Sequence, residues 1–525
     1  MYRTNLIYIF FAFALVITGC SPAAQNPSPT LSLNATPTQE TIHWSTESWQ
    51  NSTPEMQGMD SALLAQMIED ISANQTGIHS VLVIRNGQMV VEAYFHPYTQ
   101  DVKVHIQSVT KSVIGALVGI AMQEGILQNI DEPVLSFFPD YKINNPDPGK
   151  NAIQLKHLLS MASGLDCAEF TSSSSSMEQS PDWVQYMLDL PLTSAPGEQF
   201  GYCNGNAHLL SAILEKVSGM TTLDFANQEL FQVLGIPPIS QADWGTDPQG
   251  IAIGGFGLHL KPVDLAKIAL LYLRDGKWED QQIFPEGWAA ASGTQVIEKG
   301  DGSGYGYLWT VYPQDGHYAA LGLGGQQIHI FPSKDLIVVV TAGFESYAEA
   351  PEIEKMLNEY ILPAIKSDKM LAENPESQAR LQAAIGTVKH PVQPVAALPS
   401  IAQDISKSRY VFEENPLGWQ SIEFNFEPGT DSTQVIFNDA VHLEIGLDNL
   451  YRLSKTESLG ELLLRGQWID WQTFMLEYPY PLFGQNTLGE LGHTQARFRF
   501  QGDDLQVTAK ELIFGTEPVV LKGSR

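Results

Sequence analysis

The tetrapeptide Ser108-Val109-Thr110-Lys111 opens an apolar run that continues as Ser112-Val113-Ile114-Gly115-Ala116-Leu117-Val118-Gly119-Ile120-Ala121-Met122. Because this run is apolar on nearly every side, it predicts a buried helix. A serine and a lysine three positions apart on a helix share one face. The spacing therefore predicts an amine within reach of the Ser108 hydroxyl, as an activated serine nucleophile requires. Free N–H groups at the helix N-terminus would favour an oxyanion there.

Composition excludes some classes of function. The 525 residues include 59 acidic and 29 basic side chains, which gives a formal net charge of −30. Such a field repels phosphate backbones and argues against nucleic-acid binding. The length predicts two domains with linkers, and a hydrophobic content of 43% is enough to fill their cores.

The N-terminus has the form of an export signal. Arg3 precedes an apolar run over residues 6–17, and Ile17-Thr18-Gly19-Cys20 closes it. Small residues before Cys20 look like the lipobox of bacterial lipoproteins. That likeness implies removal of residues 1–19, lipidation of Cys20 and an extracytoplasmic protein anchored to the membrane. A plain secretory signal or an uncleaved anchor is the alternative. Residues 20–44 are expected to be a flexible tether.

Residues 45–365 carry alternating strand and helix signals. Residues 80–94 predict two strands joined by an Asn86-Gly87 hairpin turn. Helical segments fill the middle, strands return over 328–331 and 336–341, and a helix is expected over 351–361. This order predicts an α/β (α+β) domain with a helical subdomain, whose antiparallel sheet takes strands from both ends of the domain.

The remaining sequence divides into two parts. Residues 366–400 combine a short polar helix with a proline-rich run and are expected to be a linker. Residues 401–525 show apolar residues with a period of two and turn signals between them, which predicts an antiparallel β-sheet or barrel. This part carries no recognisable group of nucleophile and base, so binding or packing is its expected role.

Two further segments supply candidate site residues. Gly201-Tyr202-Cys203-Asn204 follows a Pro-Gly turn that would present Tyr202 from a loop. A phenol beside an ammonium can accept and return a proton, and the Asn204 amide can hold a lysine or a substrate carbonyl. The second segment is Ala320-Leu321-Gly322-Leu323-Gly324-Gly325-Gln326. Glycines at a strand edge allow another group to approach the backbone closely, and next to a nucleophile a backbone N–H there can complete an oxyanion hole.

In this order and spacing the three segments resemble the serine β-lactamase-related family, which includes class C β-lactamases, D-alanyl-D-alanine carboxypeptidases, family VIII esterases and 6-aminohexanoate-dimer hydrolases. The resemblance covers about residues 45–365. Three other stretches support it: His157-Leu158-Leu159-Ser160-Met161-Ala162-Ser163-Gly164-Leu165-Asp166, Gly254-Gly255-Phe256-Gly257-Leu258 and Tyr305-Gly306-Tyr307-Leu308-Trp309.

The resemblance implies a role for each matching residue. Ser108 would be the acylated nucleophile, and Lys111 and Tyr202 would be the acid–base pair, assisted by Asn204. The N–H groups of Ser108 and Leu323, the latter beside Gly322, would form the oxyanion hole. The implied fold is the antiparallel sheet of β-lactamases and penicillin-binding proteins, flanked by helices. The C-terminal part resembles the lipocalin-like β domain often appended to such hydrolases.

One departure from the family bears on the substrate. β-Lactamases and carboxypeptidases usually place Lys or His at the start of the third motif, where this chain has Ala320-Leu321-Gly322. Losing a charge-assisted contact costs about 1.5–3 kcal/mol with an anionic substrate. His317 could replace that cation only in another loop register. The preferred function is therefore hydrolysis of a small-molecule or peptide ester or amide. The alternatives are a β-lactamase or D-alanyl-D-alanine carboxypeptidase, and a non-catalytic lipoprotein that binds acyl groups or peptides.

The cysteines and histidines bear on disulfide bonding and metal binding. With Cys20 assigned to a lipid, Cys167 and Cys203 form either a disulfide or two buried thiols. The twelve histidines show no spacing typical of metal ligands, so neither a metal nor another cofactor is expected. Hydrogen-bonded structural roles are expected for three of them: His157, His259 and His317.

Overall fold

The computed structural model describes residues 44–74, 77–167, 177–343, 351–415, 417–456, 460–479, 493–511 and 517–525. The expected export signal, the lipidation of Cys20 and nearly all of the tether lie outside these ranges. Within the described residues, no helix combines the length and the apolar character needed to cross a bilayer.

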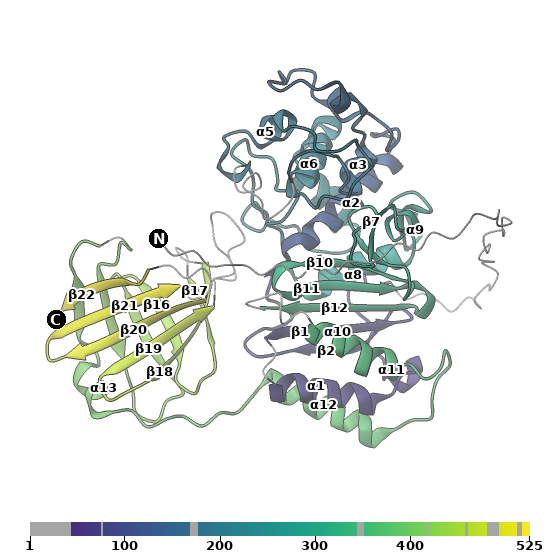
Figure 1. Ribbon diagram of the computed structural model, residues 1–525. Coiled ribbons are helices and arrows are strands. Elements are labelled where there is room, and N and C mark those ends of the chain that lie inside the picture. Colours follow the sequence, from purple (N-terminus) through teal and green to yellow (C-terminus); the bar gives the residue numbers. More distant parts are fainter. Residues whose placement is uncertain are drawn as a thin grey trace, which may run out of the picture. The chain divides into compact units, whose positions relative to one another are not determined.

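An antiparallel sheet forms the centre of the first domain (Figure 1). Its order in the described chain is β2-β1-β12-β11-β10-β9-β8-β7. Strands β1 and β12 pair directly, with Val81 opposite Val340, so strands from both ends of the domain meet as predicted. The bounds are β1 (Ile78–Arg85), β2 (Gln88–Tyr94), β7 (Ile297–Glu298), β8 (Gly304–Tyr305), β9 (Thr310–Tyr312), β10 (His317–Gly322), β11 (Gln326–Phe331) and β12 (Leu336–Ala342).

The β1–β2 hairpin turns at Asn86 and Gly87, as the sequence predicts. Both residues have positive φ, 51° and 74°. Such angles match the twist of a two-residue hairpin and suit asparagine and glycine.

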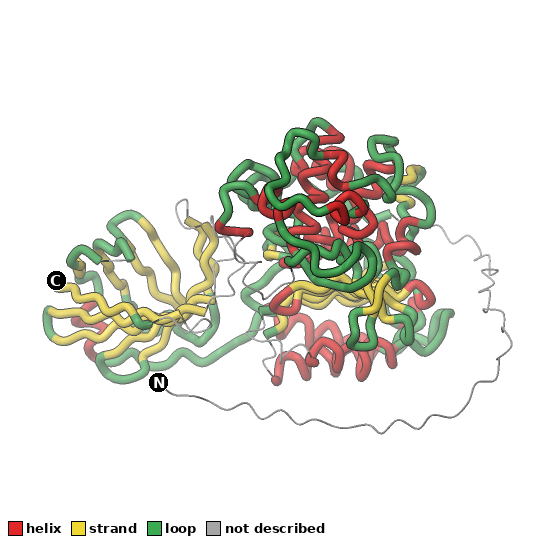
Figure 2. The backbone as a smooth tube through the Cα atoms, turned by 45° about the horizontal axis from the view of Figure 1, so that its top comes forward, coloured by secondary structure: helices red, strands yellow, loops and turns green. Residues whose placement is uncertain are grey.

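Helices cover both faces of this sheet (Figures 1 and 2). Neighbouring strand residues point to opposite faces, so Val339 packs with the helical subdomain and Val340 with the other layer. That other layer contains α1 (Ser61–Asn74), α10 (Pro351–Lys355), the π-helical turn Met356–Ile361, α11 (Leu362–Ala364) and α12 (Pro375–Lys389).

Helix α12 corrects the expected linker over residues 366–400. Its buried residues Leu381, Ala384 and Val388 belong to the same core as α1, and Arg380 pairs with Glu69. Residues 375–389 are therefore part of the first domain rather than a connection. Ile385 packs against the same core, but apolar positions in the helix are few, so the polar composition of the segment conceals its amphipathic pattern.

The helical subdomain surrounds α2 (Thr110–Gln123), whose residues 110–121 are all buried. This confirms the buried helix that the apolar run predicts, and it ends just before Gly125, at φ 69°. The surrounding elements are β3 (Val104–His105), α3 (Leu155–Leu159), α5 (Trp183–Asp189), α6 (Asn204–Ser218), α7 (Thr222–Ala226), the π-helical turn Asn227–Phe231, β4 (His259–Leu260), α8 (Pro262–Leu273), the β5 (Lys277–Trp278) and β6 (Gln281–Gln282) pair, and α9 (Trp288–Ser292).

The C-terminal domain is a closed β-barrel of nine strands among the described residues, and its strand pairs are antiparallel except for the parallel pair that closes it. Pairing of Gly446 with Arg465 closes it, and β17 pairs with β18 outside the ring. Aromatic side chains, including Phe424, Phe474 and Phe498, fill its core, together with residues of α13 (Ser400–Ile405). Its strands are β13 (Arg409–Phe412), β14 (Ser421–Asn425), β15 (Ser432–Phe437), β16 (Val441–Gly446), β17 (Arg452–Thr456), β18 (Gly460–Trp468), β19 (Thr473–Pro479), β20 (His493–Gln501), β21 (Asp504–Glu511) and β22 (Val519–Ser524).

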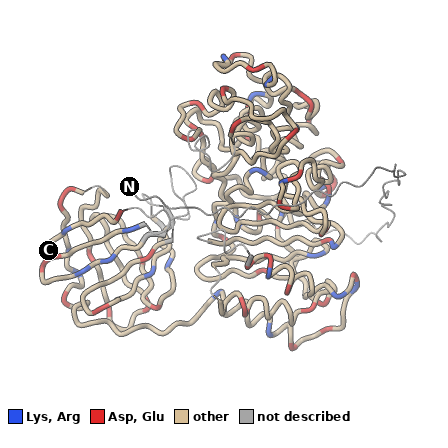
Figure 3. Tube along the Cα trace, in the orientation of Figure 1, with Lys and Arg blue, Asp and Glu red and all other residues tan. Residues whose placement is uncertain are grey.

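Acidic side chains are spread along the chain in both domains rather than gathered on one element (Figure 3). The net charge of −30 therefore does not come from one acidic element.

Two glycines inside helices test the packing of the first domain. A Cβ at Gly119 in α2 would lie 2.6 Å from Trp288 Nε1, whereas one at Gly386 in α12 would meet nothing within 4 Å. Gly119→Ala should therefore lower the stability of this domain by about 1–3 kcal/mol through overpacking. Gly386→Ala should raise it by about 0.5–1 kcal/mol, because alanine restricts the unfolded chain. Denaturant unfolding of both variants checks the prediction, and equal effects would contradict it.

Candidate active site

Ser108 lies in a tight turn immediately before α2. The turn is a 3₁₀ segment, Gln107–Val109, and it leads directly into Thr110. The Thr110 hydroxyl donates to the carbonyl of Gln107 at 2.7 Å and so closes the turn. Ser108 is partly exposed, whereas both of its neighbours are buried. The structure thus places this hydroxyl at the surface of an otherwise buried element.

The side chain of Lys111 contacts three other segments of the site. Its side chain is 1% exposed, and its Nζ donates to Ser108 Oγ at 3.0 Å, to Asn204 Oδ1 at 2.5 Å and to the carbonyl of Gly255 at 2.7 Å. An ammonium has three N–H donors, and these three oxygens match them. The Nζ also lies 4.7 Å from the centre of the Tyr202 ring. This arrangement suits a buried cation, which needs paired hydrogen bonds to be tolerated in the interior.

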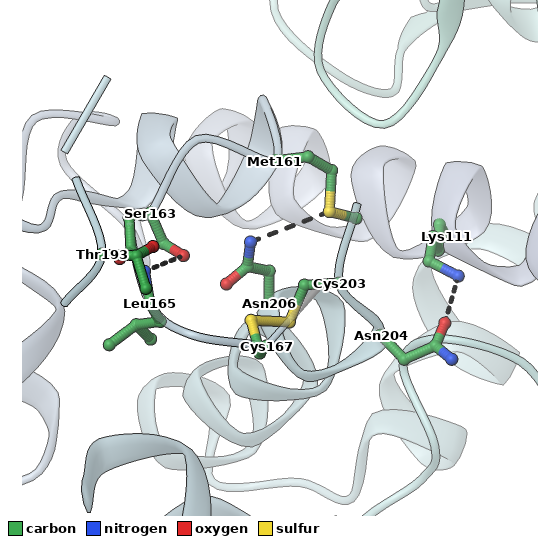
Figure 4. The surroundings of a disulfide bond; sticks show 10 residues. Lys111, Met161, Ser163, Leu165, Cys167, Thr193, Cys203, Asn204 and Asn206 are labelled. Atoms are coloured by element: carbon green, nitrogen blue, oxygen red, sulfur yellow. Dashed lines mark hydrogen bonds between the residues drawn. A yellow bond between two sulfur atoms is a disulfide. The ribbon is translucent and has the colours of Figure 1, made fainter. Parts of the chain in front are cut away.

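Tyr202 and Asn204 are held by a neighbouring loop. The N–H of Gly201 donates to the carbonyl of Met161 at 2.8 Å, and that of Gly197 donates to Ala162 at 2.7 Å. Asn204 is the first residue of α6, so its side chain projects from the start of that helix towards Lys111 (Figure 4). Tyr202 therefore follows the Pro-Gly turn that the sequence indicates, on a segment that is hydrogen-bonded to the backbone of residues 161–162.

A disulfide between Cys167 and Cys203 ties the same two segments together (Figure 4). The Cα atoms are 5.6 Å apart, and both side chains are buried. Of the two alternatives for these cysteines, the structure has the disulfide. Cys203 caps α6 and stands between Tyr202 and Asn204, so the covalent link restrains the backbone that presents both side chains.

Gly322 brings the third segment against the Ser108 turn. It ends β10, and a Cβ at this position would lie 2.7 Å from the carbonyl oxygen of Ile106. Only glycine allows so close an approach. Leu323 then begins a turn that contains Gly324 at φ 74°. The side-chain amide of Gln326 donates to the carbonyl of Gly324 at 3.4 Å and to the carbonyl of Ala342. The backbone beside Leu323 is thus fixed next to Ser108.

Three buried residues around the site have left-handed backbone. Gln107, Met161 and Leu308 have φ of 52°, 55° and 62°, which is uncommon for residues with long side chains. Gln107 lies in the Ser108 turn, Met161 accepts from the N–H of Gly201, and Leu308 accepts from the Ser112 hydroxyl of α2 at 2.7 Å. Such conformations cost on the order of 1–3 kcal/mol and tend to gather at functional sites. Sequence reasoning missed them, because no residue type signals them.

The histidines named from the sequence each have a ring or hydrogen-bond partner of their own, and His259 stacks on His105. His317 stacks on Tyr312 and Phe331, with ring centres 4.4 and 4.5 Å apart, and burial lowers its pKa to about 4. It is neutral at pH 7 and does not replace the missing cation. His157 accepts from the N–H of Gln154 at 3.0 Å as part of a helix cap. Among the described residues, no group of three or more His, Cys, Asp or Glu side chains could hold a metal.

The chain is similar in sequence and in fold to several known proteins. The family model described as Beta-lactamase matches residues 64–355. A 6-aminohexanoate-dimer hydrolase of Paenarthrobacter ureafaciens is 23% identical over 301 residues, which is 53% of this chain and 76% of the relative. The similar solved structures include EstCE1, a hydrolase with promiscuous acyltransferase activity, with 18% identity and a TM-score of 0.49 over 58% of this chain and 99% of the other. They also include an octameric penicillin-binding protein homologue from Pyrococcus abyssi, with 17% identity and a TM-score of 0.44 over 88% of this chain and 99% of the other.

The disulfide generates a prediction about stability. Cys167→Ala combined with Cys203→Ala should lower the free energy of unfolding by about 2–5 kcal/mol, because the unfolded chain loses a covalent restraint. Thermal unfolding with and without reductant measures the effect. Cys20→Ala, which leaves the bridge intact, is the control. Thiol labelling of unreduced, denatured protein should modify neither Cys167 nor Cys203, and labelling of both would contradict the bridge.

Proposed function

Because this chain belongs to the β-lactamase family, we propose that it is a serine hydrolase that cleaves an ester or amide bond through an acyl-enzyme on Ser108. The observation that carries the proposal is the 3.0 Å contact between Lys111 Nζ and Ser108 Oγ, with Asn204 and Tyr202 around the same amine. The match of the family model supports hydrolase chemistry in general, and the acyl-enzyme on Ser108 is the specific step that we add.

The proposed reaction has two halves. Before the attack, one of Lys111 and Tyr202 gives up its own proton to solvent, so that the pair can act as a base. Ser108 Oγ then attacks the carbonyl carbon while its proton passes to that pair. The oxyanion accepts hydrogen bonds from the N–H groups of Ser108 and Leu323. The bond to the leaving alcohol or amine then breaks, and the leaving group takes up that proton. Water attacks the acyl-enzyme in the second half, the acid is released, and the Ser108 hydroxyl regains its proton.

The third segment supports a neutral acyl group as substrate. Ala320, Leu321 and Gly322 stand where β-lactamases and carboxypeptidases usually begin the motif with Lys or His. Without that cation a substrate carboxylate loses a charge-assisted contact, worth roughly ten- to more than a hundredfold in affinity. We therefore favour esters and amides over β-lactams and D-alanyl-D-alanine peptides.

We further propose that the protein works outside the cytoplasm, anchored to the membrane through a lipid on Cys20. The form of the first twenty residues supports this location. The Cys167–Cys203 disulfide fits it as well, because disulfides persist in oxidising compartments.

The acyl-enzyme predicts a labelling pattern. A fluorophosphonate probe should add one adduct to the wild-type protein, and intact-mass and peptide analysis should place it on Ser108. Ser108→Ala should lose the adduct and at least a thousandfold of the ester hydrolysis, since the nucleophile is gone. Ser112→Ala is the matched control: this serine lies one turn along α2 and faces Leu308 instead, so labelling should persist.

Two outcomes would contradict the acyl-enzyme. Full hydrolytic activity in Ser108→Ala would remove Ser108 from the reaction. A stable adduct from a natural acyl donor, with no turnover by the wild-type protein, would favour the alternative of a binding protein over a hydrolase.

Substrate charge gives a second test. Paired esters that differ only by a carboxylate on the acyl part should be hydrolysed unequally, with kcat/KM about ten- to a hundredfold higher for the neutral member. Steady-state kinetics over a range of salt concentrations measures this ratio. A preference for the anionic ester would contradict the proposal and favour a cation outside the third segment.

A further inference from the structure

We infer that His105 is a positioning residue for Lys111, acting through the loop Gly254–Gly257, an inference that rests on the proposed role of Lys111. The N–H of Gly257 donates to His105 Nε2 at 3.0 Å. Because a backbone N–H can only donate, Nε2 holds a lone pair, and the ring carries its proton on Nδ1. Burial and the nearby His259 ring lower the pKa of His105 to about 3, so the acceptor is maintained at neutral pH.

A short ladder brings this histidine and the loop together beside Ser108. His105 in β3 pairs with His259 in β4, and their rings stack with centres 4.8 Å apart. The N–H of Ile106 donates to the carbonyl of Leu258 at 2.9 Å. The segment that leads into the Ser108 turn and the segment that leaves the loop are therefore two paired strands.

The loop Gly254–Gly257 contacts the same amine as the Ser108 turn. The carbonyl of Gly255 accepts from Lys111 Nζ at 2.7 Å. A Cβ at Gly254 would overlap the carbonyl of Ala207, and one at Gly255 would lie 2.8 Å from Asn204 Oδ1. Helix α6 thus limits the loop on one side. On the other side, Gly257 is held twice: its carbonyl accepts from the N–H of Gly245 at 3.3 Å, and its own N–H donates to His105.

The contacts assign a specific task to His105. The ring binds the N–H of Gly257, and the Gly255 carbonyl two residues earlier accepts from the amine, so the ring acts by holding the loop within reach of Lys111. Removal of the acceptor would leave a partly buried N–H unpaired and release the loop. The orientation of Lys111, rather than affinity for a substrate, would then change.

Two substitutions separate this task from a general structural role. His105→Phe keeps a flat ring that can stack on His259 but has no acceptor. His105→Gln places an amide oxygen near the position of Nε2 and so retains an acceptor. Steady-state hydrolysis of a neutral ester, thermal unfolding and the ¹³Cε resonance of Lys111 in lysine-labelled protein, assigned with Lys111→Met, are measured for both variants.

The expected result is a kcat about five- to tenfold lower in His105→Phe with KM within twofold, and near wild-type values in His105→Gln, at similar unfolding temperatures. The Lys111 resonance should move in His105→Phe and stay in His105→Gln. An unchanged kcat and resonance in His105→Phe, or equal losses in both variants, would overturn the inference. If the wild-type protein hydrolyses no ester, the proposed function fails, and the resonance alone decides whether His105 positions Lys111.

Discussion

The buried amine of Lys111 is the constraint on which the site depends. A cation placed where 1% of the side chain is exposed must be surrounded by acceptors, and each acceptor belongs to a different part of the chain. Ser108 comes from the turn before α2, Asn204 from the start of α6 and the Gly255 carbonyl from a glycine-rich loop. Satisfying one lysine therefore fixes three segments around one point, and that point is where the Ser108 hydroxyl stands.

This convergence requires unusual local structure. Left-handed backbone at Gln107, Met161 and Leu308, glycine at Gly322 and Gly255, and a disulfide at Cys203 all lie within these segments or beside them. Their conformations are unfavourable or restrictive taken singly, and the packed helical subdomain compensates for them. Several independent contacts restrain each segment of the site. Such rigidity is what a preorganised oxyanion hole and acid–base pair require.

Features with a local cause could be predicted from the sequence. The Asn86-Gly87 turn, the buried helix after Lys111 and the strands on either side of residue 335 each follow from a short pattern. Features that depend on distant partners could not. The packing of α12 on α1 rests on few apolar residues and is missed from the sequence, although a short polar helix is expected there. The Gly255 carbonyl is a backbone atom without a residue-specific signal, and the described strands close the barrel through a single pair, Gly446 with Arg465.

The pairing of β1 with β12 has a consequence for biogenesis. Val81 and Val340 are partners although they lie 259 positions apart in the sequence, so the hairpin that emerges first has no neighbour on one edge until the last strand of the sheet arrives. Pairing over such distances is slow and leaves strand edges open to other chains. During synthesis the early hairpin must therefore be kept from self-association, and a chain truncated before residue 336 would lack the strand that completes its scaffold.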